Sequence, residues 1–246
     1  MLNIRALTCN LLQERTYIAW NGSAHCVLID PGCYGSDEIR TLTDLLAQEN
    51  LTPAAILLTH GHFDHIFGVK PLQDRFGGIP VYMHPADEVV LGYSADMAGR
   101  LGLDAPAIDF AWTPVQDGQV LEVAGIRFEV ITTPGHTPGG VCWLVRDADV
   151  MFTGDTLFAG SIGRTDFLYS EYDDEIRSIM EKLILLDPAI RILPGHGPTS
   201  TIGHERTGNP FLEPFNEPEE ALDPNAEPVV IKGESPESGS APLPPC

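Results

Sequence analysis

The apolar positions of this chain fall mostly into short runs that end in turn-forming residues, a pattern typical of buried β-strands. Residues 24–29 form one such run, which ends at an Asp-Pro-Gly turn signal at residues 30–32. Two runs on either side of Ala124-Gly125 predict a β-hairpin. In all, the runs predict strands at residues 24–29, 54–58, 79–83, 120–123, 126–131, 141–145, 150–152 and 189–193.

Two segments between these runs have helical spacing. Residues 173–186 carry an apolar stripe that predicts an amphipathic helix. We expect Ser36 to cap another helix, with Glu38 in its first turn. Strands, helices and hairpins in this order predict an α/β fold in which helices cover the outer faces of two sheets. A single doubly wound parallel sheet fits less well, because hairpins pair neighbouring strands antiparallel.

The aliphatic periodicity ends near residue 213. Residues 213–246 hold eight acidic residues, one lysine and eight prolines. Such a segment buries too little apolar surface to offset the entropy of ordering, so we expect a disordered acidic tail. Docking of a basic partner is the less favoured interpretation, because charge runs are usually solvated. The predicted organisation is one folded domain at residues 1–212 followed by this tail at residues 213–246.

Composition narrows the classes of function. With 246 residues, 43% of them hydrophobic, the chain is long enough for a packed core. Its net charge of −21 argues against binding to nucleic-acid backbones or to anionic lipid. No apolar run reaches the roughly 18 residues of a membrane span. The sequence therefore predicts neither nucleic acid nor membrane as a partner, and it leaves the oligomeric state open.

The cysteines and the first residues indicate a compartment. The five cysteines are scattered, odd in number and without a Cys-x-x-Cys pair, which argues against a disulfide framework. Residues 1–10 lack the cationic start and long apolar stretch of a secretion signal. We therefore expect a cytoplasmic protein.

The strongest chemical signal is the segment Thr-His-Gly-His-Phe-Asp-His at residues 59–65, directly after a predicted strand. In an extended chain His60 and His62 point to the same side, so both can bind one metal ion. If a helix begins after His62, Asp64 and His65 turn away from that pair and can bind a second ion nearby. Imidazole and carboxylate ligands suit zinc, iron or manganese.

Three more potential ligands follow predicted strands, and each is immediately preceded by a glycine. They are His136, Asp155 and His196. The glycine allows the backbone to turn sharply and to approach its neighbours closely. Five histidines and two aspartates exceed the needs of one tetrahedral site. They suit two metal ions that share a carboxylate and a water.

The other histidines are expected to be structural, since each lacks such a setting. They are His25, His84 and His204. We expect Asp30 to accept hydrogen bonds from backbone amides of its own turn. The alternative for Asp30 is a role in orienting a metal ligand.

Four segments, taken in order, resemble the metallo-β-lactamase superfamily and most of all its hydroxyacylglutathione hydrolase (glyoxalase II) branch. They are Thr-His-Gly-His-Phe-Asp-His, Pro-Gly-His-Thr-Pro, Thr-Gly-Asp-Thr-Leu-Phe and Pro-Gly-His-Gly-Pro. The resemblance implies a four-layer αββα sandwich with metal ions at the sheet edges. Residues 213–246 do not resemble the helical glutathione-binding domain of that branch. The chain is more similar to short glyoxalase II-like hydrolases, and Ser-Ile-Gly-Arg-Thr-Asp-Phe at residues 161–167 matches that group.

The resemblance also implies how the ligands divide between two divalent ions, with zinc expected first and iron or manganese as alternatives. The first ion would be bound by His60, His62 and His136, the second by Asp64, His65 and His196, and Asp155 would bridge both. Asp64 and Asp155 are then the candidate catalytic residues, because Asp64 would also orient the attacking water.

The implied reaction is hydrolysis of a small-molecule acyl thioester, such as a hydroxyacylglutathione, by a metal-bound hydroxide. Water bound to a divalent metal can have a pKa near 7. A thiolate leaves readily because its thiol has a pKa near 8.5, so no strong general acid is required. Arg164 is a candidate for binding a substrate carboxylate, and a structural salt bridge is the alternative for it.

Other functions fit parts of the pattern. A persulfide dioxygenase of the same superfamily, with one iron, is the main alternative, although Gly195-His196-Gly197 favours two metal ions. A metal-binding module without activity is disfavoured by seven candidate ligands. A β-lactamase is less favoured because no cysteine lies near the motifs, and a nuclease is less favoured because of the negative charge.

Overall fold

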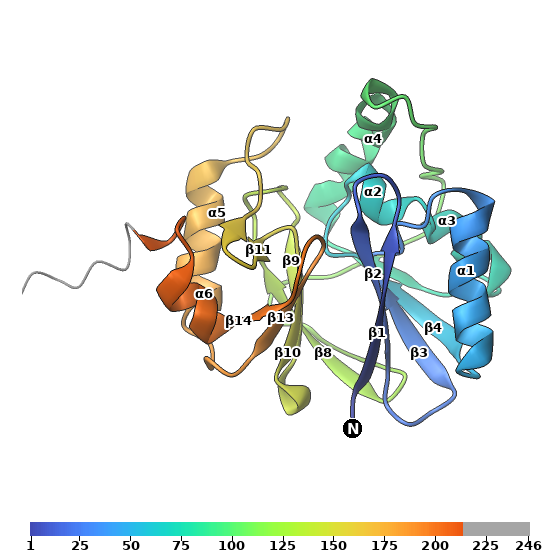
Figure 1. Ribbon diagram of the computed structural model, residues 1–246. Coiled ribbons are helices and arrows are strands. Elements are labelled where there is room, and N and C mark those ends of the chain that lie inside the picture. The colour runs from blue at the N-terminus through green and yellow to red at the C-terminus, as the bar shows by residue number, and fades with distance from the viewer. Residues whose placement is uncertain (214–246) are drawn as a thin grey trace, which may run out of the picture. The chain divides into compact units, whose positions relative to one another are not determined.

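The computed structural model describes residues 1–213, in which two six-stranded sheets pack face to face (Figure 1). The first sheet has the order β1 (Asn3–Cys9), β2 (Glu14–Trp20), β3 (His25–Ile29), β4 (Thr52–Leu57), β5 (Val81–Met83), β6 (Thr113–Pro114). The second has the order β14 (Ser200–Thr201), β13 (Arg191–Pro194), β10 (Val150–Gly154), β9 (Val141–Val145), β8 (Ile126–Thr132), β7 (Val120–Val123). A small third sheet pairs β11 (Leu157–Phe158) with β12 (Ser161–Ile162).

Helices cover the outer face of each sheet (Figure 1). The α-helices are α1 (Gly35–Gln48), α2 (Phe63–Ile66), α3 (Val69–Arg75), α4 (Glu88–Arg100), α5 (Tyr172–Ser178) and α6 (Ile202–Gly208). Short 3₁₀ turns occupy Pro85–Asp87 and Arg146–Ala148, and a π-helical segment, Ile179–Leu183, continues α5. Apolar residues of α1 and α3 pack on the first sheet, and those of α5, its continuation and α6 pack on the second. The predicted α/β class and αββα sandwich are confirmed.

The layers follow from the alternation of side chains along each strand. Val27 and Ile29 of β3 point into the core between the sheets, while Leu28 points to the helical layer outside. Trp143 and Phe128 meet the first sheet in that central core and are fully buried. Strands buried on both faces explain why the sequence shows continuous apolar runs.

Strand directions bring several strand ends to one edge. β8 and β10 both run antiparallel to β9, and β13 runs parallel to β10. The carboxyl ends of β8, β10 and β13 therefore lie together. The end of β4 joins them from the first sheet, because the Val141 amide donates to the Thr59 carbonyl at 2.8 Å and Trp143 Nε1 donates to the Leu58 carbonyl at 3.1 Å.

Two local predictions are corrected. Ser36 does not cap α1, which begins at Gly35 with Tyr34 as its N-cap residue. Glu38 lies in the first turn, as expected, and its carboxylate accepts from the amide of the N-cap residue Tyr34 at 2.7 Å and from the Asn10 amide at 2.9 Å. The helix predicted at residues 173–186 is α-helical only to Ser178, after which its hydrogen bonding changes to the π pattern.

No helix within residues 1–213 is both long and apolar enough to cross a membrane. The predicted acidic tail lies outside the described residues, except for Glu213. The boundary at residue 212 therefore stays a prediction.

Candidate metal centre

All of the predicted ligands lie together at the edge where β4, β8, β10 and β13 end. They are His60, His62, Asp64, His65, His136, Asp155 and His196. The glycine before each later ligand permits this convergence: a Cβ on Gly195 would collide with Asp155 and His65. Gly154 has a φ of +49°, and a Cβ there would collide with the Thr59 side chain.

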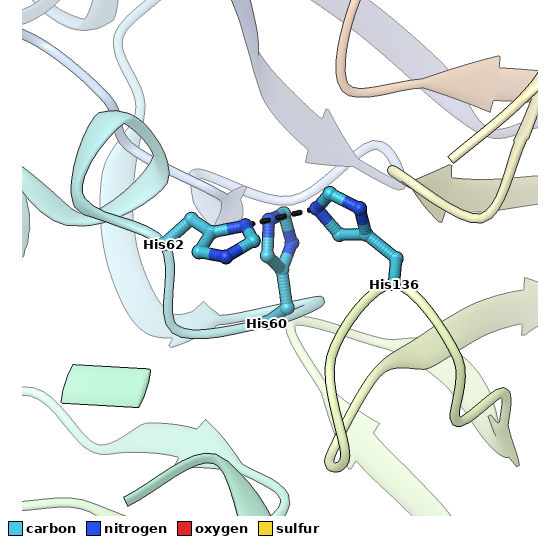
Figure 2. Close-up of side chains that lie close together, drawn as sticks. All are labelled: His60, His62 and His136. Atoms are coloured by element: carbon cyan, nitrogen blue, oxygen red, sulfur yellow. Dashed lines mark hydrogen bonds between the residues drawn. The ribbon is translucent and has the colours of Figure 1, made fainter. Parts of the chain in front are cut away.

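The first ligand group consists of His60, His62 and His136, whose rings converge from two loops (Figure 2). His62 Nδ1 lies 2.8 Å from His136 Nε2. The His60 ring centroid lies 4.8 Å from that of His62 and 5.0 Å from that of His136. His60 Nε2 is buried and has no hydrogen-bond partner among residues 1–213. Such an unpartnered buried nitrogen is unfavourable unless it binds a ligand, and a metal ion would satisfy it.

The second ligand group consists of Asp64, His65 and His196. His196 Nε2 lies 3.3 Å from His65 Nε2 and 3.2 Å from Asp64 Oδ2. The predicted helix start is confirmed, because α2 begins at Phe63 with His62 as its N-cap residue. After this change of backbone direction Asp64 and His65 lie close to His196, while the His65 ring also stays beside that of His60, with 4.1 Å between the two centroids.

Asp155 lies between the two groups. Its Oδ2 is 3.6 Å from His136 Nε2 and 3.5 Å from His196 Nε2, and its Oδ1 is 3.4 Å from His65 Nε2. Burial alone would raise the pKa of Asp155, but His65 and His196 hold that pKa well below its ordinary value. The side chain is therefore a carboxylate that faces ligands of both groups.

The charge states of the donors fit a cation. Burial lowers the pKa of His60 well below its ordinary value and lowers that of His62 to about 3, so both rings are neutral and offer a lone pair. Burial acts in the same direction on His65, but Asp155 and Asp64 raise its pKa overall. Positive charge is thus favoured where the carboxylates gather, and a divalent cation would supply it.

Hydrogen bonds to the outer ring nitrogens orient the histidines. His136 Nδ1 donates to the Arg164 carbonyl at 2.7 Å, and His196 Nδ1 donates to the Leu12 carbonyl at 3.0 Å. Each of these bonds leaves Nε2 facing the centre of the cluster. Bonds of this kind fix the tautomer and the ring orientation of metal-binding histidines.

Asp30 is an orienting residue rather than the turn residue that was expected. Its Oδ1 accepts from the Thr59 amide at 2.7 Å, and its Oδ2 accepts from Thr59 Oγ1 at 2.5 Å and from His65 Nδ1 at 3.2 Å. The expectation of bonds within its own turn is therefore wrong, and the contact with His65 is the one that the alternative role requires. Asp30, His60 and His65 are also close enough to form a ligand group, but Thr59 already occupies the Asp30 carboxylate.

Two buried carboxyl groups hold the loops that carry the ligands, and the sequence analysis did not identify them. Asp87 accepts from the Gly61 amide at 2.7 Å, the Gly139 amide at 2.6 Å and Thr137 Oγ1 at 3.0 Å. It thereby joins the two loops of the first group, and burial raises its pKa to about 6. Glu175 of α5 accepts from the His136 amide at 2.8 Å, and burial raises its pKa to about 8.

A cavity of about 540 Å³ opens onto the ligands. Arg164 lies at this cavity, and its guanidinium is 2.8 Å from Asp166 Oδ2 and 4.5 Å from the centroid of the Phe167 ring. The salt bridge foreseen as the alternative is present. Binding of a substrate carboxylate by Arg164 stays a prediction.

The remaining histidines lie outside the ligand groups found in residues 1–213. His25 is exposed at the start of β3, and His204 is exposed in α6. His84 Nδ1 accepts a hydrogen bond from the Ala86 amide at 3.3 Å, so its role is to cap the 3₁₀ turn that follows.

Known proteins are similar to this chain in sequence and in fold. The family model described as "Metallo-beta-lactamase superfamily" matches residues 10–196, which include all seven candidate ligands. Hydroxyacylglutathione hydrolase GloC from Haemophilus influenzae is 36% identical over 215 residues, which cover 86% of this chain and 98% of that protein.

Two crystal structures have the same fold. BLEG-1 B3 metallo-beta-lactamase is 35% identical with a TM-score of 0.79, over 85% of this chain and 99% of that chain. TTHA1623 in a di-iron-bound form is 38% identical with a TM-score of 0.76, over 85% of this chain and 100% of that chain. The similarity therefore extends over nearly the whole length of both structures.

Proposed function

Because the chain belongs to the metallo-beta-lactamase superfamily, and is thus a metal-dependent hydrolase, we propose that it is a binuclear thioester hydrolase of the short glyoxalase II-like group. One observation carries the proposal of two ions. The Asp155 carboxylate lies within 3.4–3.6 Å of histidine nitrogens from both ligand groups, as a bridging ligand must. The relative GloC, a hydroxyacylglutathione hydrolase, supports a thioester as the substrate.

In such a site each of the two ligand groups would bind one metal ion. His60, His62 and His136 would hold one ion, and Asp64, His65 and His196 the other. When bound, two divalent ions would lower the pKa of a water molecule and polarise the scissile carbonyl. Zinc, iron and manganese all suit this donor set, and TTHA1623 is a relative with two irons.

The chain itself supplies orientation rather than a nucleophile. Hydrogen bonds to the Arg164 and Leu12 carbonyls occupy the outer nitrogens of His136 and His196, so these rings are fixed as ligands. Asp64 Oδ2 faces the same cluster and would also accept a hydrogen bond from the attacking water. A thiolate leaving group needs no strong acid, because its thiol has a pKa near 8.5.

Hydrolysis of a thioester panel tests the proposal. The protein is loaded with zinc, iron or manganese and assayed with S-lactoylglutathione and with acyl thioesters of other thiols. We expect metal-dependent release of free thiol, and an Asp155→Asn variant should lose most of it. The exposed Asp147 is the matched control, and Asp147→Asn should retain full activity.

Two parallel assays separate the competing functions. Ring opening of a cephalosporin is included because BLEG-1, at 35% identity, is a B3 metallo-beta-lactamase. Oxygen consumption with glutathione persulfide reports the dioxygenase alternative. The thioester proposal fails if either of these reactions proceeds while every thioester remains intact.

A further inference from the structure

The cavity that opens onto the candidate metal ligands has a wall that is mainly apolar wherever it is not formed by those ligands. Met97 and Leu101 contribute from α4 and the residue after it, and Phe167 and Leu168 contribute from the loop that follows β12. Its volume of about 540 Å³ falls within the range of small-molecule sites. The ligand cluster therefore opens into a space that suits an apolar group of moderate size.

Several of these apolar side chains are exposed to water. Leu101 is 54% exposed and Leu168 is 53% exposed, and they line the same cavity. Single exposed leucines are ordinary on a protein surface, whereas a cluster around one concave site marks a binding site. An apolar ligand would remove this surface from water, which is favourable in proportion to the area buried.

The cations at the cavity already have acidic partners. Arg100 lies 2.8 Å from Asp96 Oδ2, and Arg164 lies 2.8 Å from Asp166 Oδ2. Both guanidiniums also lie over aromatic rings of the cavity wall, at 5.5 Å from the Tyr93 centroid and 4.5 Å from that of Phe167. The positive charge at this rim is thus balanced, and the chain as a whole carries a net charge of −21.

We propose that this cavity binds the acyl group of an apolar thioester, such as a medium-length aliphatic or arylalkyl acyl chain. The inference rests on the proposed thioester hydrolase activity. The acyl group is the half assigned to the cavity because the thiols that carry acyl groups in cells, such as coenzyme A and glutathione, are polar and anionic. Such a thiol fits the solvent side of the rim, while the carbonyl lies at the ligand cluster.

An acyl series on one thiol tests the proposal. Acetyl, lactoyl, butyryl, hexanoyl and phenylacetyl thioesters of N-acetylcysteamine are compared by kcat/KM. A fully buried methylene contributes about 0.8 kcal/mol, or about fourfold in kcat/KM. We expect at least about a tenfold gain from acetyl to hexanoyl, since the cavity is partly open to solvent. Equal or higher kcat/KM for acetyl or lactoyl would overturn the proposal.

A matched pair of variants locates the effect. Leu168→Ser should lower the ratio of kcat/KM for hexanoyl to kcat/KM for acetyl about fivefold. Leu185 is 75% exposed and does not line the cavity, so Leu185→Ser should change neither substrate. Equal losses for hexanoyl and acetyl in Leu168→Ser would show a general structural role and would contradict an acyl site at this wall.

Binding of inert analogues provides a readout that does not depend on turnover. The hexyl thioether of N-acetylcysteamine should bind more tightly than the ethyl thioether by calorimetry, and Leu168→Ser should remove this difference. If no thioester is hydrolysed, the proposed function fails and the acyl assignment fails with it, even if hexyl binding persists. If every thioester is hydrolysed without a gain from chain length, only the acyl assignment fails.

Discussion

The two ligand groups both face Asp155, but their side chains differ in exposure to solvent. His60, His62 and His136 are 2%, 4% and 5% exposed. In the second group His65 is fully buried, whereas the His196 side chain is 26% exposed. His136 is also held through both its ring and its backbone amide, while the His196 ring is held by the carbonyl of Leu12, an exposed residue of the turn between β1 and β2.

This difference indicates that the two metal positions are unequal. A ligand side chain that is buried and held by hydrogen bonds keeps its orientation without a metal ion. A solvent-exposed ligand side chain can rotate away from the metal position. We therefore expect the first group to bind its ion more tightly than the second. Asp155 is the exception, because it faces both groups and its loss should affect both.

The largest effect is expected from Asp155→Ala. Removal of the shared carboxylate should lower kcat/KM for thioester hydrolysis by at least about a hundredfold. Bound metal should fall from about two equivalents to about one, because the second group retains only three ligands, one of which is the exposed His196. Enzyme kinetics and elemental analysis measure the two effects.

The fold should survive that substitution, because Asp155 is not part of the apolar core. Circular dichroism should be unchanged, and Asp147→Ala should behave as wild type in all assays. A variant Asp155→Ala that keeps its metal and most of its activity would show that the two groups do not share this ligand.

A direct comparison of the groups uses one histidine from each. His196→Ala should lose the second ion, keep about one equivalent of metal and lose about tenfold to a hundredfold in kcat/KM. His62→Ala should weaken the tighter site and cost more activity. Metal content after dialysis against a weak chelator ranks the two variants. An equal loss of metal from both would contradict the expectation that the two positions bind their ions with unequal affinity.

A smaller effect on chemistry, but a clear one on stability, is expected from Asp87→Ala. The Gly61 and Gly139 amides and Thr137 Oγ1 would lose their acceptor inside the protein. Leaving buried donors unpaired should lower the free energy of unfolding by about 3 kcal/mol. Urea denaturation measures this, with exposed Asp44→Ala as the control, and a change below about 0.5 kcal/mol would show that Asp87 does not hold the two loops.

The smallest effect is expected from His204→Ala. His204 is exposed in α6 and belongs to none of the ligand groups within residues 1–213. Turnover and metal content should stay within about twofold of wild type. A large loss of metal in this variant would reveal a ligand that neither the motifs nor the geometry indicates.

The ligand cluster could be predicted from the sequence because its residues lie in short motifs. Four donors within residues 59–65, and a glycine before each later ligand, are visible without a structure. The strands beneath them were also visible, since strands buried on both faces leave continuous apolar runs. How the donors serve as ligands stays a prediction that the metal analysis tests.

Other features depend on distant partners and could not be foreseen. Asp87 and Glu175 hold the loops through backbone amides that are far away in sequence, so no motif surrounds them. Asp30 bonds to Thr59, which follows the neighbouring strand β4, rather than within its own turn. Helix α4 was missed because two glycines and polar residues interrupt its apolar spacing, although it forms a wall of the cavity.

The most direct test of the binuclear hydrolase is a metal titration of the metal-free protein, followed by thioester turnover and elemental analysis. We expect about two equivalents of bound metal, the first tighter than the second, with full turnover only after the second has bound. Full activity at one tightly bound iron, with oxygen consumed and no thioester hydrolysed, would contradict this expectation.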